Sequence, residues 1–414
     1  MKKLNKLALL AAVGGSLGMI AWAEFSDDRT KFRAQRFQAG PRNFPPASGS
    51  PQFGDPLPGL TADQLSAFAV GLEDFQQVDV PESGLGPIFN NVSCVACHSV
   101  PAIGGSSAIL ETRFGRSVNG QFDPLTHLGG SLLQQFAIDP GYQEVIPPEA
   151  NVTAQRQATP LFGLGLIEAV PDGAILQYAE CRKPDGITGR PAIVPDVASG
   201  QQRVGRFGWK AQQATLLAFA ADAYLNEVGI TSRLFPQENA PNGDTSLLAV
   251  LDLVADPEDE VDPVSGNADI DTFAAFMRFL APPPQLPLSD SANSGQTLFH
   301  QIGCATCHTP SMQTGTNSVA ALDRKPVPLY SDLLLHDMGA LGDGIAQVVA
   351  GPREMRTAPL WGLRASGPYL HDGRAATAEE AIRGHDGEGR YPRERFLRLS
   401  PTQRQQLLDF LNFI

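Results

Sequence analysis

The sequence predicts a mainly α-helical protein with two similar domains, long loops and little β structure. Helical periodicity is clear over residues 61–75, 207–229 and 270–280, whereas strand signals are few. A Cys-x-x-Cys-His pattern occurs twice, at residues 94–98 and 304–308. Because the two copies lie far apart, we expect each to belong to a domain of its own.

The repeated pattern is typical of c-type haem attachment. Two thiols one turn apart can each add to a haem vinyl group, and the adjacent histidine then ligates the iron from the proximal side. A zinc ribbon needs its cysteine pairs about 15–20 residues apart, and a redox pair does not require the histidine. The sequence therefore predicts two covalently attached c-type haems, with attachment and proximal residues Cys94, Cys97, His98, Cys304, Cys307 and His308.

The segments that lead into the two motifs also resemble each other. Phe89 and Phe299 each lie five positions before the first cysteine of a motif, and a glycine comes shortly before each phenylalanine. We interpret this as an internal repeat of the cytochrome c entry helix. The two domains are therefore expected to be cytochrome c-like.

The N-terminal segment has the features of a secretory signal peptide. Lys2, Lys3 and Lys6 precede an apolar stretch, and residues 21–23 (Ala-Trp-Ala) fit a cleavage site. A membrane anchor is the alternative, but the apolar stretch contains several glycines and is short for a span. We expect export to the periplasm and no membrane span in the mature chain.

Composition narrows the classes of partner. The chain has 414 residues, of which 42% are hydrophobic and 18% charged, so it can bury a sizeable core. Its net charge of −13 disfavours nucleic acid and anionic membranes as partners. It permits steering of a basic electron-transfer protein, although a merely solvated acidic surface is an equal alternative. Cys181 belongs to neither motif, and we expect it to be buried and inert.

The positions of prolines, glycines and candidate helix caps indicate the boundaries between the segments of the chain. Thr61 is a candidate N-cap, Ser400 and Pro401 mark the start of a last helix, and a proline run follows residue 281. The predicted segments are a signal peptide (1–23), an extended arm (24–60), a first haem domain (61–239), an interdomain segment (240–287) and a second haem domain (288–414).

Ordered motifs in both halves resemble a known family. They are TPLFGLGLIE (159–168), GRFGWK (205–210), LLHDMG (334–339), TAPLWGLR (357–364) and PYLHDG (368–373). With the two haem motifs, they are similar to the di-haem oxidoreductase family, also called thiol oxidoreductases. This family belongs to the group of bacterial di-haem cytochrome c peroxidases and MauG-type enzymes.

The resemblance implies that the C-terminal haem receives electrons and that the N-terminal haem cleaves peroxide. A small cytochrome is then the expected electron donor. In peroxidase relatives a methionine after the Pro-Tyr-x-His-Asp-Gly stretch ligates the C-terminal haem, and His385 stands in its place here. Bis-histidine ligation lowers the reduction potential relative to His/Met ligation. Met338 or His336 is the alternative ligand.

The first haem is less well defined. His127 is a candidate distal ligand, and the alternative is an open or water-bound site. The first half lacks the acid/base segment of the peroxidase relatives, so Glu168 is the candidate catalytic residue, with a structural helix-start carboxylate as the alternative. Trp209 or Trp361 could relay electrons. Residues 366–368 match only part of a calcium-binding stretch of the relatives, so calcium is an open alternative.

Three functions fit this outline. The first is a peroxidase-like oxidoreductase that reacts with peroxide or another small oxidant. The second is a non-catalytic di-haem electron carrier with both irons six-coordinate. The third is oxidation of an organic or protein substrate, as in MauG-type enzymes and rubber oxygenases, because one architecture can host several reactions.

Overall fold

The computed structural model describes residues 51–414. The predicted signal peptide and residues 24–50 of the predicted arm lie outside this range. The structure is 36% helical and 15% strand, so the prediction of a mainly α protein is confirmed in its coarse form. Within the described range, no helix combines the length and apolar character needed to cross a membrane.

Three helices form the core around the first motif. They are α2 (Ala62–Phe75), α5 (Leu216–Ala223) and α7 (Asp269–Phe279), and α7 packs against both of the others. Thr61 caps α2 as predicted, since its hydroxyl accepts a hydrogen bond from the Gln64 amide at 3.3 Å. The rings of Phe75 and Phe276 pack at 4.9 Å between centroids. Cys94 contacts this core from its edge.

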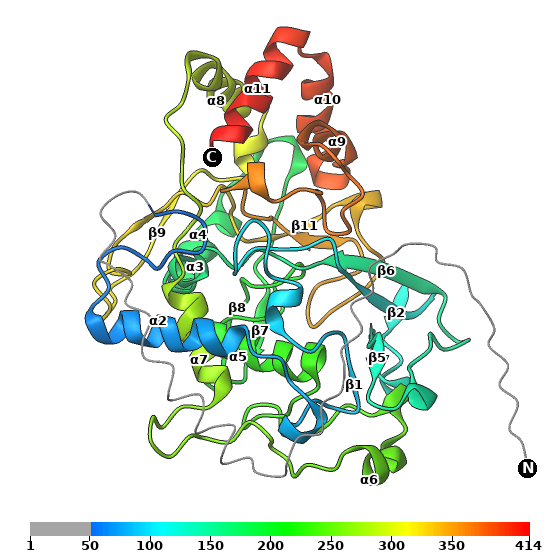
Figure 1. Cartoon of the computed structure of the whole chain (residues 1–414). Coiled ribbons are helices and arrows are strands. Elements are labelled where there is room, and N and C mark those ends of the chain that lie inside the picture. Colours follow the sequence, from blue (N-terminus) through cyan, green and yellow to red (C-terminus); the bar gives the residue numbers. More distant parts are fainter. Residues whose placement is uncertain (1–50) are drawn as a thin grey trace, which may run out of the picture. The chain divides into compact units, whose positions relative to one another are not determined.

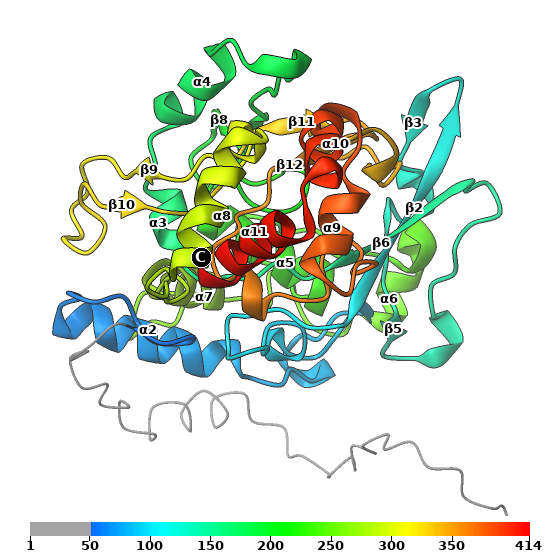
Figure 2. The same ribbon diagram turned by 90° about the horizontal axis from the view of Figure 1, so that it is seen from above.

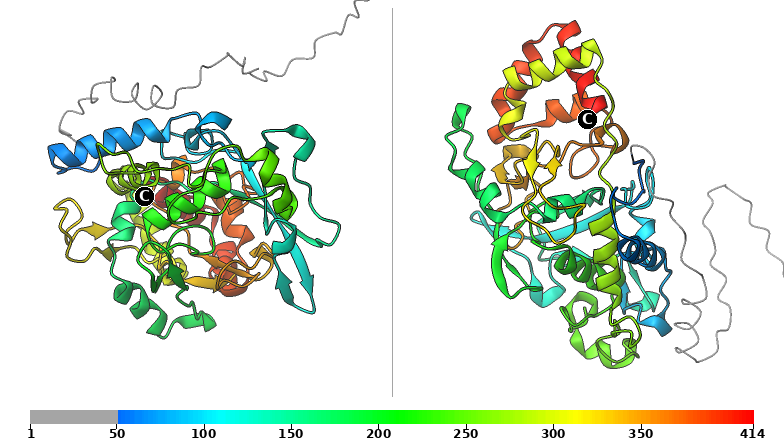
Figure 3. Two further views of the ribbon diagram at one scale, coloured as in Figure 1. Left: turned by 90° about the horizontal axis from the view of Figure 1, so that it is seen from below. Right: turned by 90° about the vertical axis from the view of Figure 1, so that its left-hand side faces the viewer.

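Four helices gather near the C-terminus, at the top of Figure 1 and of the right-hand view in Figure 3. They are α8 (Asp290–Gln301), α9 (Ala378–Gly384), α10 (Arg390–Arg398) and α11 (Pro401–Phe413). Phe299 of α8 packs on Phe410 of α11 at 5.3 Å. Ser400 and Pro401 begin α11 as predicted. Cys304 packs against this second core.

The contact between α8 and α11, side by side in Figure 2, depends on Gly295. A β-carbon at Gly295 would lie 1.9 Å from the Gln406 carbonyl oxygen, so the helices would have to separate. We predict that Gly295→Ala lowers the free energy of unfolding by about 1–3 kcal/mol, despite the better helix propensity of alanine. Denaturant unfolding measures this. Gly173→Ala on α4 (Asp172–Glu180) is the matched control, because nothing lies within 4 Å of its β-carbon, and it should be neutral or stabilising.

The largest sheet joins β2 (Leu110–Val118), β3 (Gln121–Asp123), β4 (Leu132–Leu133) and β6 (Val152–Gln157). Strands β2 and β6 are antiparallel, with Glu111 opposite Arg156 and Arg113 opposite Ala154. Because side chains alternate along a strand, Glu111 and Arg113 share one face. The sequence did not indicate this sheet, since the alternating residues on this face are charged rather than apolar.

The remaining elements are short. The other helices are α3 (Leu164–Glu168), α4 and α6 (Leu248–Leu251). The other strands are β1 (Ile88–Phe89), β5 (Phe136–Ala137), β7 (Ile193–Asp196), β8 (Gln201–Val204), β9 (Met312–Gln313), β10 (Pro326–Val327), β11 (Leu335–Asp337) and β12 (Glu354–Arg356).

One helix is shorter than its periodicity predicted. The pattern over 207–229 predicted a helix that opens at Phe207, but α5 begins at Leu216, after the Thr215 cap. Gly208 and Ala211 adopt positive φ angles of 76° and 52°, which a helix cannot contain. The segment before Leu216 is instead a loop that carries Trp209 and Lys210 into the interior.

Candidate functional site

The first Cys-x-x-Cys-His motif lies at a partly buried turn. Cys94, Cys97 and His98 line a cavity of about 180 Å³, which we call the first cavity. His98 Nδ1 donates a hydrogen bond to the Gly105 carbonyl oxygen at 2.9 Å. Burial lowers the pKa of His98, so the ring is neutral and its Nε2 lone pair is free to bind a metal.

The second motif repeats this arrangement. Cys304, Cys307 and His308 line a larger cavity of about 280 Å³, which we call the second cavity. His308 Nδ1 donates to the Tyr330 carbonyl oxygen at 3.1 Å. Burial and the nearby His385 lower the pKa of His308 to about 4. This imidazole is therefore also neutral, with Nε2 available as a ligand.

The four motif cysteines are free thiols that suit haem attachment better than redox chemistry. Burial raises the pKa of Cys94 above its usual range, that of Cys97 to about 11 and that of Cys304 to about 12. Catalytic and redox-active cysteines need a lowered pKa. Two thiols beside a neutral histidine are the donor set of a c-type haem, so both motifs fit this cofactor.

His385 lies opposite His308 in the second cavity. The centroids of the two rings are 6.4 Å apart. One iron bound between two imidazoles would separate the centroids by about 6.4 Å, since each metal–nitrogen bond is about 2 Å and each nitrogen lies about 1.2 Å from its ring centre. His385 Nδ1 donates to the Ala381 carbonyl oxygen at 2.8 Å, and burial lowers its pKa. The structure thus brings together the two histidines that the sequence paired.

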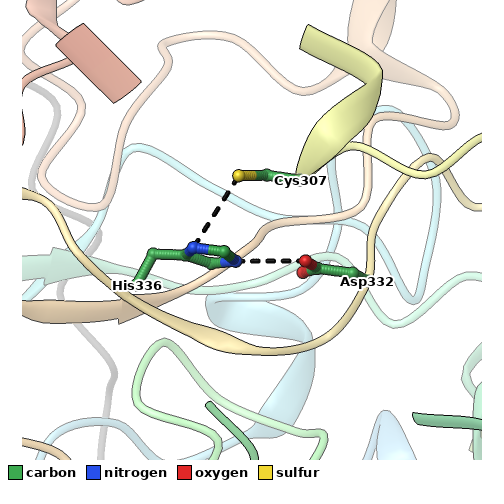
Figure 4. A group of neighbouring side chains, drawn as sticks. All are labelled: Cys307, Asp332 and His336. Carbon is green, nitrogen blue, oxygen red and sulfur yellow. Dashed lines mark hydrogen bonds and ion pairs between the residues drawn. The ribbon is translucent and has the colours of Figure 1, made fainter. Parts of the chain in front are cut away.

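The alternative ligands also lie near the second motif. Met338 and His336 both line the second cavity. His336 is already engaged, because its Nε2 lies 3.1 Å from Asp332 and its Nδ1 lies 2.6 Å from Glu388. Figure 4 shows His336 between Asp332 and Cys307, whose sulfur is 3.7 Å away. These groups lie close enough for a metal ion, but Cys307 belongs to the haem motif.

The His336 cluster contains a buried ion pair. Burial disfavours the charged ring, but hydrogen bonds to Asp332, Cys307 and Glu388 raise the pKa of His336 to about 12. Although burial opposes it, the same contact lowers the pKa of Asp332 to about 2. Lys183 also binds Asp332, at 2.8 Å. His336 is therefore a cation between two carboxylates.

We predict that His336→Gln lowers the free energy of unfolding by about 3–5 kcal/mol, because it removes the buried cation between Asp332 and Glu388 and leaves Lys183 as the only cation beside Asp332. Because the pKa of His336 is raised by folding, its contribution to the stability of the folded state is fully present below about pH 6.5. Because the pKa values of Asp332 and Glu388 are lowered by folding, their contribution is present above about pH 4. The loss should therefore be largest between these values and shrink on both sides. Denaturant unfolding across pH measures it. His300→Gln, at an exposed position, is the control, and an equal loss there would contradict the ion-pair explanation.

The first cavity holds no second histidine among the residues that line it. The candidate distal ligand His127 is exposed, at the short 3-10 helix η3 (Thr126–Leu128), and lines neither cavity. The structure therefore does not bring His127 toward His98. The two motifs differ in this respect, since the second has a facing histidine and the first does not.

The candidate catalytic residue Glu168 also lies outside both cavities. Its Oε2 accepts a hydrogen bond from Arg278 Nε at 2.7 Å, and its Oε1 accepts one from the Leu216 amide at 2.8 Å. The second contact satisfies a free amide in the first turn of α5. These contacts are structural, although Glu168 is the last residue of α3 and not the helix-start carboxylate of the sequence-based alternative.

A different carboxyl pair lines the first cavity, namely Glu111 and Glu227. The two groups are hydrogen-bonded to each other, and Asn90 Nδ2 donates to Glu227 at 2.7 Å. Arg113 donates to both oxygens of Glu111 at 2.9 and 3.1 Å. Burial and the neighbouring Glu111 raise the pKa of Glu227 to about 8. Despite burial, Arg113 lowers the pKa of Glu111.

At neutral pH the pair therefore shares one proton, held by Glu227 and donated toward the Glu111 carboxylate. Two carboxyl groups with separated pKa values are a common source of acid/base function. Sequence reasoning missed them because Glu111 lies on an unpredicted strand and Glu227 at the end of the α5 segment. A signal existed in the Glu-x-Arg pattern of β2, which places both side chains on one face.

One wall separates the two cavities. Trp209 and its neighbours Gln157 and Thr159 line both of them. The Trp209 ring nitrogen donates to the Gln157 carbonyl oxygen at 2.8 Å, and the ring meets His371 edge-on at 6.3 Å between centroids. Trp361 lines only the second cavity. Of the two tryptophans considered as relays, Trp209 is the one between the sites.

The structure also describes Cys181 and the stretch that was considered for calcium binding. Cys181 is exposed, at the end of α4, so the expectation of a buried thiol was wrong. In the stretch considered for calcium, the Pro368 carbonyl oxygen accepts a hydrogen bond from Gln157 at 3.1 Å. Three carboxylates elsewhere, those of Glu238, Asp256 and Glu258, approach within 4.8 Å of one another.

Each of the two Cys-x-x-Cys-His motifs lines a cavity of its own, and the two cavities share lining residues. Residues 148–414 match the family described as "Di-haem oxidoreductase, putative peroxidase". The chain belongs to this di-haem oxidoreductase family, which implies haem cofactors. The match begins after the first motif, so the assignment of that motif rests on its own residues. No curated protein matches the chain.

Three solved structures are similar to it at low identity. Hydrazine synthase from Kuenenia stuttgartiensis shares 13% identity with a TM-score of 0.41 and covers 98% of this chain and 100% of its own. A MauG-like protein associated with microbial copper homeostasis shares 16% identity with a TM-score of 0.39, and the match covers 90% of this chain and 94% of that protein. A variant of the diheme peroxidase BthA from Burkholderia thailandensis shares 14% identity with a TM-score of 0.39, and the match covers 88% of this chain and 90% of that protein. At these TM-scores the family assignment rests on the sequence match.

Proposed function

We propose that this protein is a peroxidase-like c-type di-haem oxidoreductase. Electrons enter at the second, C-terminal site and are used at the first, N-terminal site to reduce peroxide or another small oxidant. The observation that carries this proposal is the difference between the sites. His385 faces His308 in the second cavity, whereas the first cavity has no facing histidine but contains the proton-sharing Glu111–Glu227 pair.

The residues that would hold the cofactors follow from the motifs. Cys94 and Cys97 would attach the first haem, and Cys304 and Cys307 the second. His98 and His308 would be the proximal ligands, and His385 the distal ligand at the second site. Haem supplies electron transfer and O–O bond cleavage when bound.

The chain's own contribution at the first cavity is proton transfer. Reduction of peroxide to two waters consumes two electrons and two protons. Glu227 carries a proton at neutral pH, and Glu111 can return one along their shared hydrogen bond. A positioned acid of this kind contributes about 10²- to 10⁴-fold to a rate. Arg113 holds Glu111 in place through two hydrogen bonds.

Trp209 supports an electron path between the sites, because it lines both cavities. Its hydrogen bond to Gln157 fixes the ring in the shared wall. A small basic cytochrome fits as the electron donor, given the net charge of −13. Export to the periplasm, with cleavage of residues 1–23, remains part of the proposal, and calcium binding stays a prediction.

Electron paramagnetic resonance of the haem-loaded protein tests the proposal, in the oxidised and the half-reduced states. We expect one low-spin ferric signal from the second site and one high-spin signal from the first, which peroxide consumes. Two low-spin signals that persist and ignore peroxide would instead indicate an electron carrier. Peroxide consumption that needs an organic co-substrate rather than a reduced cytochrome would indicate substrate oxidation.

A further inference from the structure

Arg356 of β12 is a buried cation without a carboxylate partner. Its side chain lines the second cavity, and the residue is 7% exposed. Its Nε donates to the Gly208 carbonyl oxygen at 2.8 Å and its Nη1 to the Thr357 carbonyl oxygen at 3.3 Å. Burial lowers the pKa of Arg356 to about 10, and no neighbouring charge offsets it. Even at this value the guanidinium is charged at neutral pH.

The other buried cations of residues 51–414 all have carboxylates. Lys210 and Arg156 both pair with Asp343, at 3.0 and 2.7 Å, and Arg206 pairs with Asp172. Among these buried arginine and lysine side chains, Arg356 alone has no carboxylate partner. Burying an unpaired charge is costly, so an anion in the second cavity is the missing partner.

The position of Arg356 indicates which anion. Strand β12 pairs with β11, where His336 lies 3.7 Å from the Cys307 sulfur. On its other side, the Arg356 amide donates to the Trp209 carbonyl oxygen at 2.9 Å. Arg356 thus lies between the second attachment site and the shared wall. A haem attached at Cys304 and Cys307 would bring its two carboxylates into the cavity that Arg356 also lines.

We propose that Arg356 is the counter-ion of a haem carboxylate at the second site. The inference rests on haem occupancy of the second motif and not on the peroxidase reaction. A guanidinium suits this role, because its hydrogen bonds to a carboxylate are charge-assisted and stronger than those between neutral groups. Two of its nitrogens already donate to backbone carbonyls, which orients the remaining Nη2.

Spectroelectrochemistry of the holoprotein between pH 5 and 9 tests the proposal. In the wild type, the haem carboxylate paired with Arg356 should stay ionised over this pH range. The midpoint potential of the second haem should therefore show no change caused by protonation of that carboxylate. In Arg356→Met the potential should shift downward at high pH, where an uncompensated carboxylate favours ferric iron, and recover as the carboxylate protonates at low pH. Arg356→Lys keeps the charge and should stay near the wild type. Arg353→Met, at an exposed neighbouring position, is the matched control.

Two results would overturn the proposal. One is an unchanged potential and pH profile in Arg356→Met. The other is a wild-type haem spectrum that shifts saturably with added formate or acetate, which would make the partner a free carboxylate. If Arg356→Met does not fold, a crystal structure of the haem-loaded wild type decides, since the guanidinium must lie within hydrogen-bond distance of a haem carboxylate. None of these measurements depends on peroxide turnover, so failure of the proposed function would be separately visible.

Discussion

Replacing His385 with alanine will convert the second haem from low-spin to high-spin ferric iron. The reason is that His385 faces His308 at 6.4 Å between ring centroids, with its Nδ1 held by the Ala381 carbonyl oxygen. Imidazole favours ferric iron, so its loss should also raise the midpoint potential, by on the order of 0.1 V within the range of about 0.8 V that axial ligands span. Electron paramagnetic resonance and spectroelectrochemistry measure the two effects.

His300→Ala serves as the control for this experiment, because His300 is exposed on α8 and lines neither cavity. It should keep both the low-spin signal and the potential. If His385→Ala stays low-spin, another side chain must ligate the iron. Met338 also lines the second cavity, so the double variant with Met338→Leu would then identify it as the ligand.

Replacing Glu227 with glutamine will reduce peroxide turnover by about 10²- to 10⁴-fold, the usual contribution of a positioned acid or base. Glutamine keeps the size of the side chain and its hydrogen bond from Asn90, but it cannot transfer a proton. Because the pKa of Glu227 is raised to about 8, the acid form is present below that pH. Wild-type turnover should therefore fall above about pH 8, and this limb should disappear in Glu227→Gln. Steady-state rates across pH measure both effects.

Glu149→Gln is the control for the Glu227 variant, because Glu149 is exposed and lies on neither cavity. Its turnover and pH profile should match the wild type. The assignment fails if Glu227→Gln keeps full turnover. If Glu168→Gln removes turnover while its stability is retained, the acid/base residue is the one that the sequence first indicated.

The local features of the fold could be predicted from the sequence. The caps at Thr61 and Ser400 each involve a residue three positions later, so a short window of sequence contains all of the information. The haem motifs are equally local. The same reasoning failed at the loop before Leu216, because positive φ angles at Gly208 and Ala211 interrupted an apolar pattern that looked continuous.

The candidate site depends on contacts that no short window contains. Glu111 and Glu227 are brought together by β2 and by the π-helix η6 (Tyr224–Val228) that follows α5. Strand β2 itself was missed, since its cavity face carries charges and gives no hydrophobic alternation. Glu168 was chosen because it was the acid near a recognised motif, but Arg278 and Leu216 use both of its oxygens. His385 could be found because an ordered motif preceded it by a fixed spacing.

The buried ion pairs described above have a consequence for modularity. Asp343 lies in the predicted second haem domain (288–414), whereas its partners Arg156 and Lys210 lie in the predicted first domain (61–239). Lys183 of the first domain pairs with Asp332 of the second in the same way. A C-terminal fragment expressed alone would contain Asp343 and Asp332 without these basic partners. An N-terminal fragment would contain the basic residues without their carboxylates. The two predicted domains therefore cannot be exchanged independently of each other. A chimaera with a relative would have to replace both partners of each of these ion pairs together.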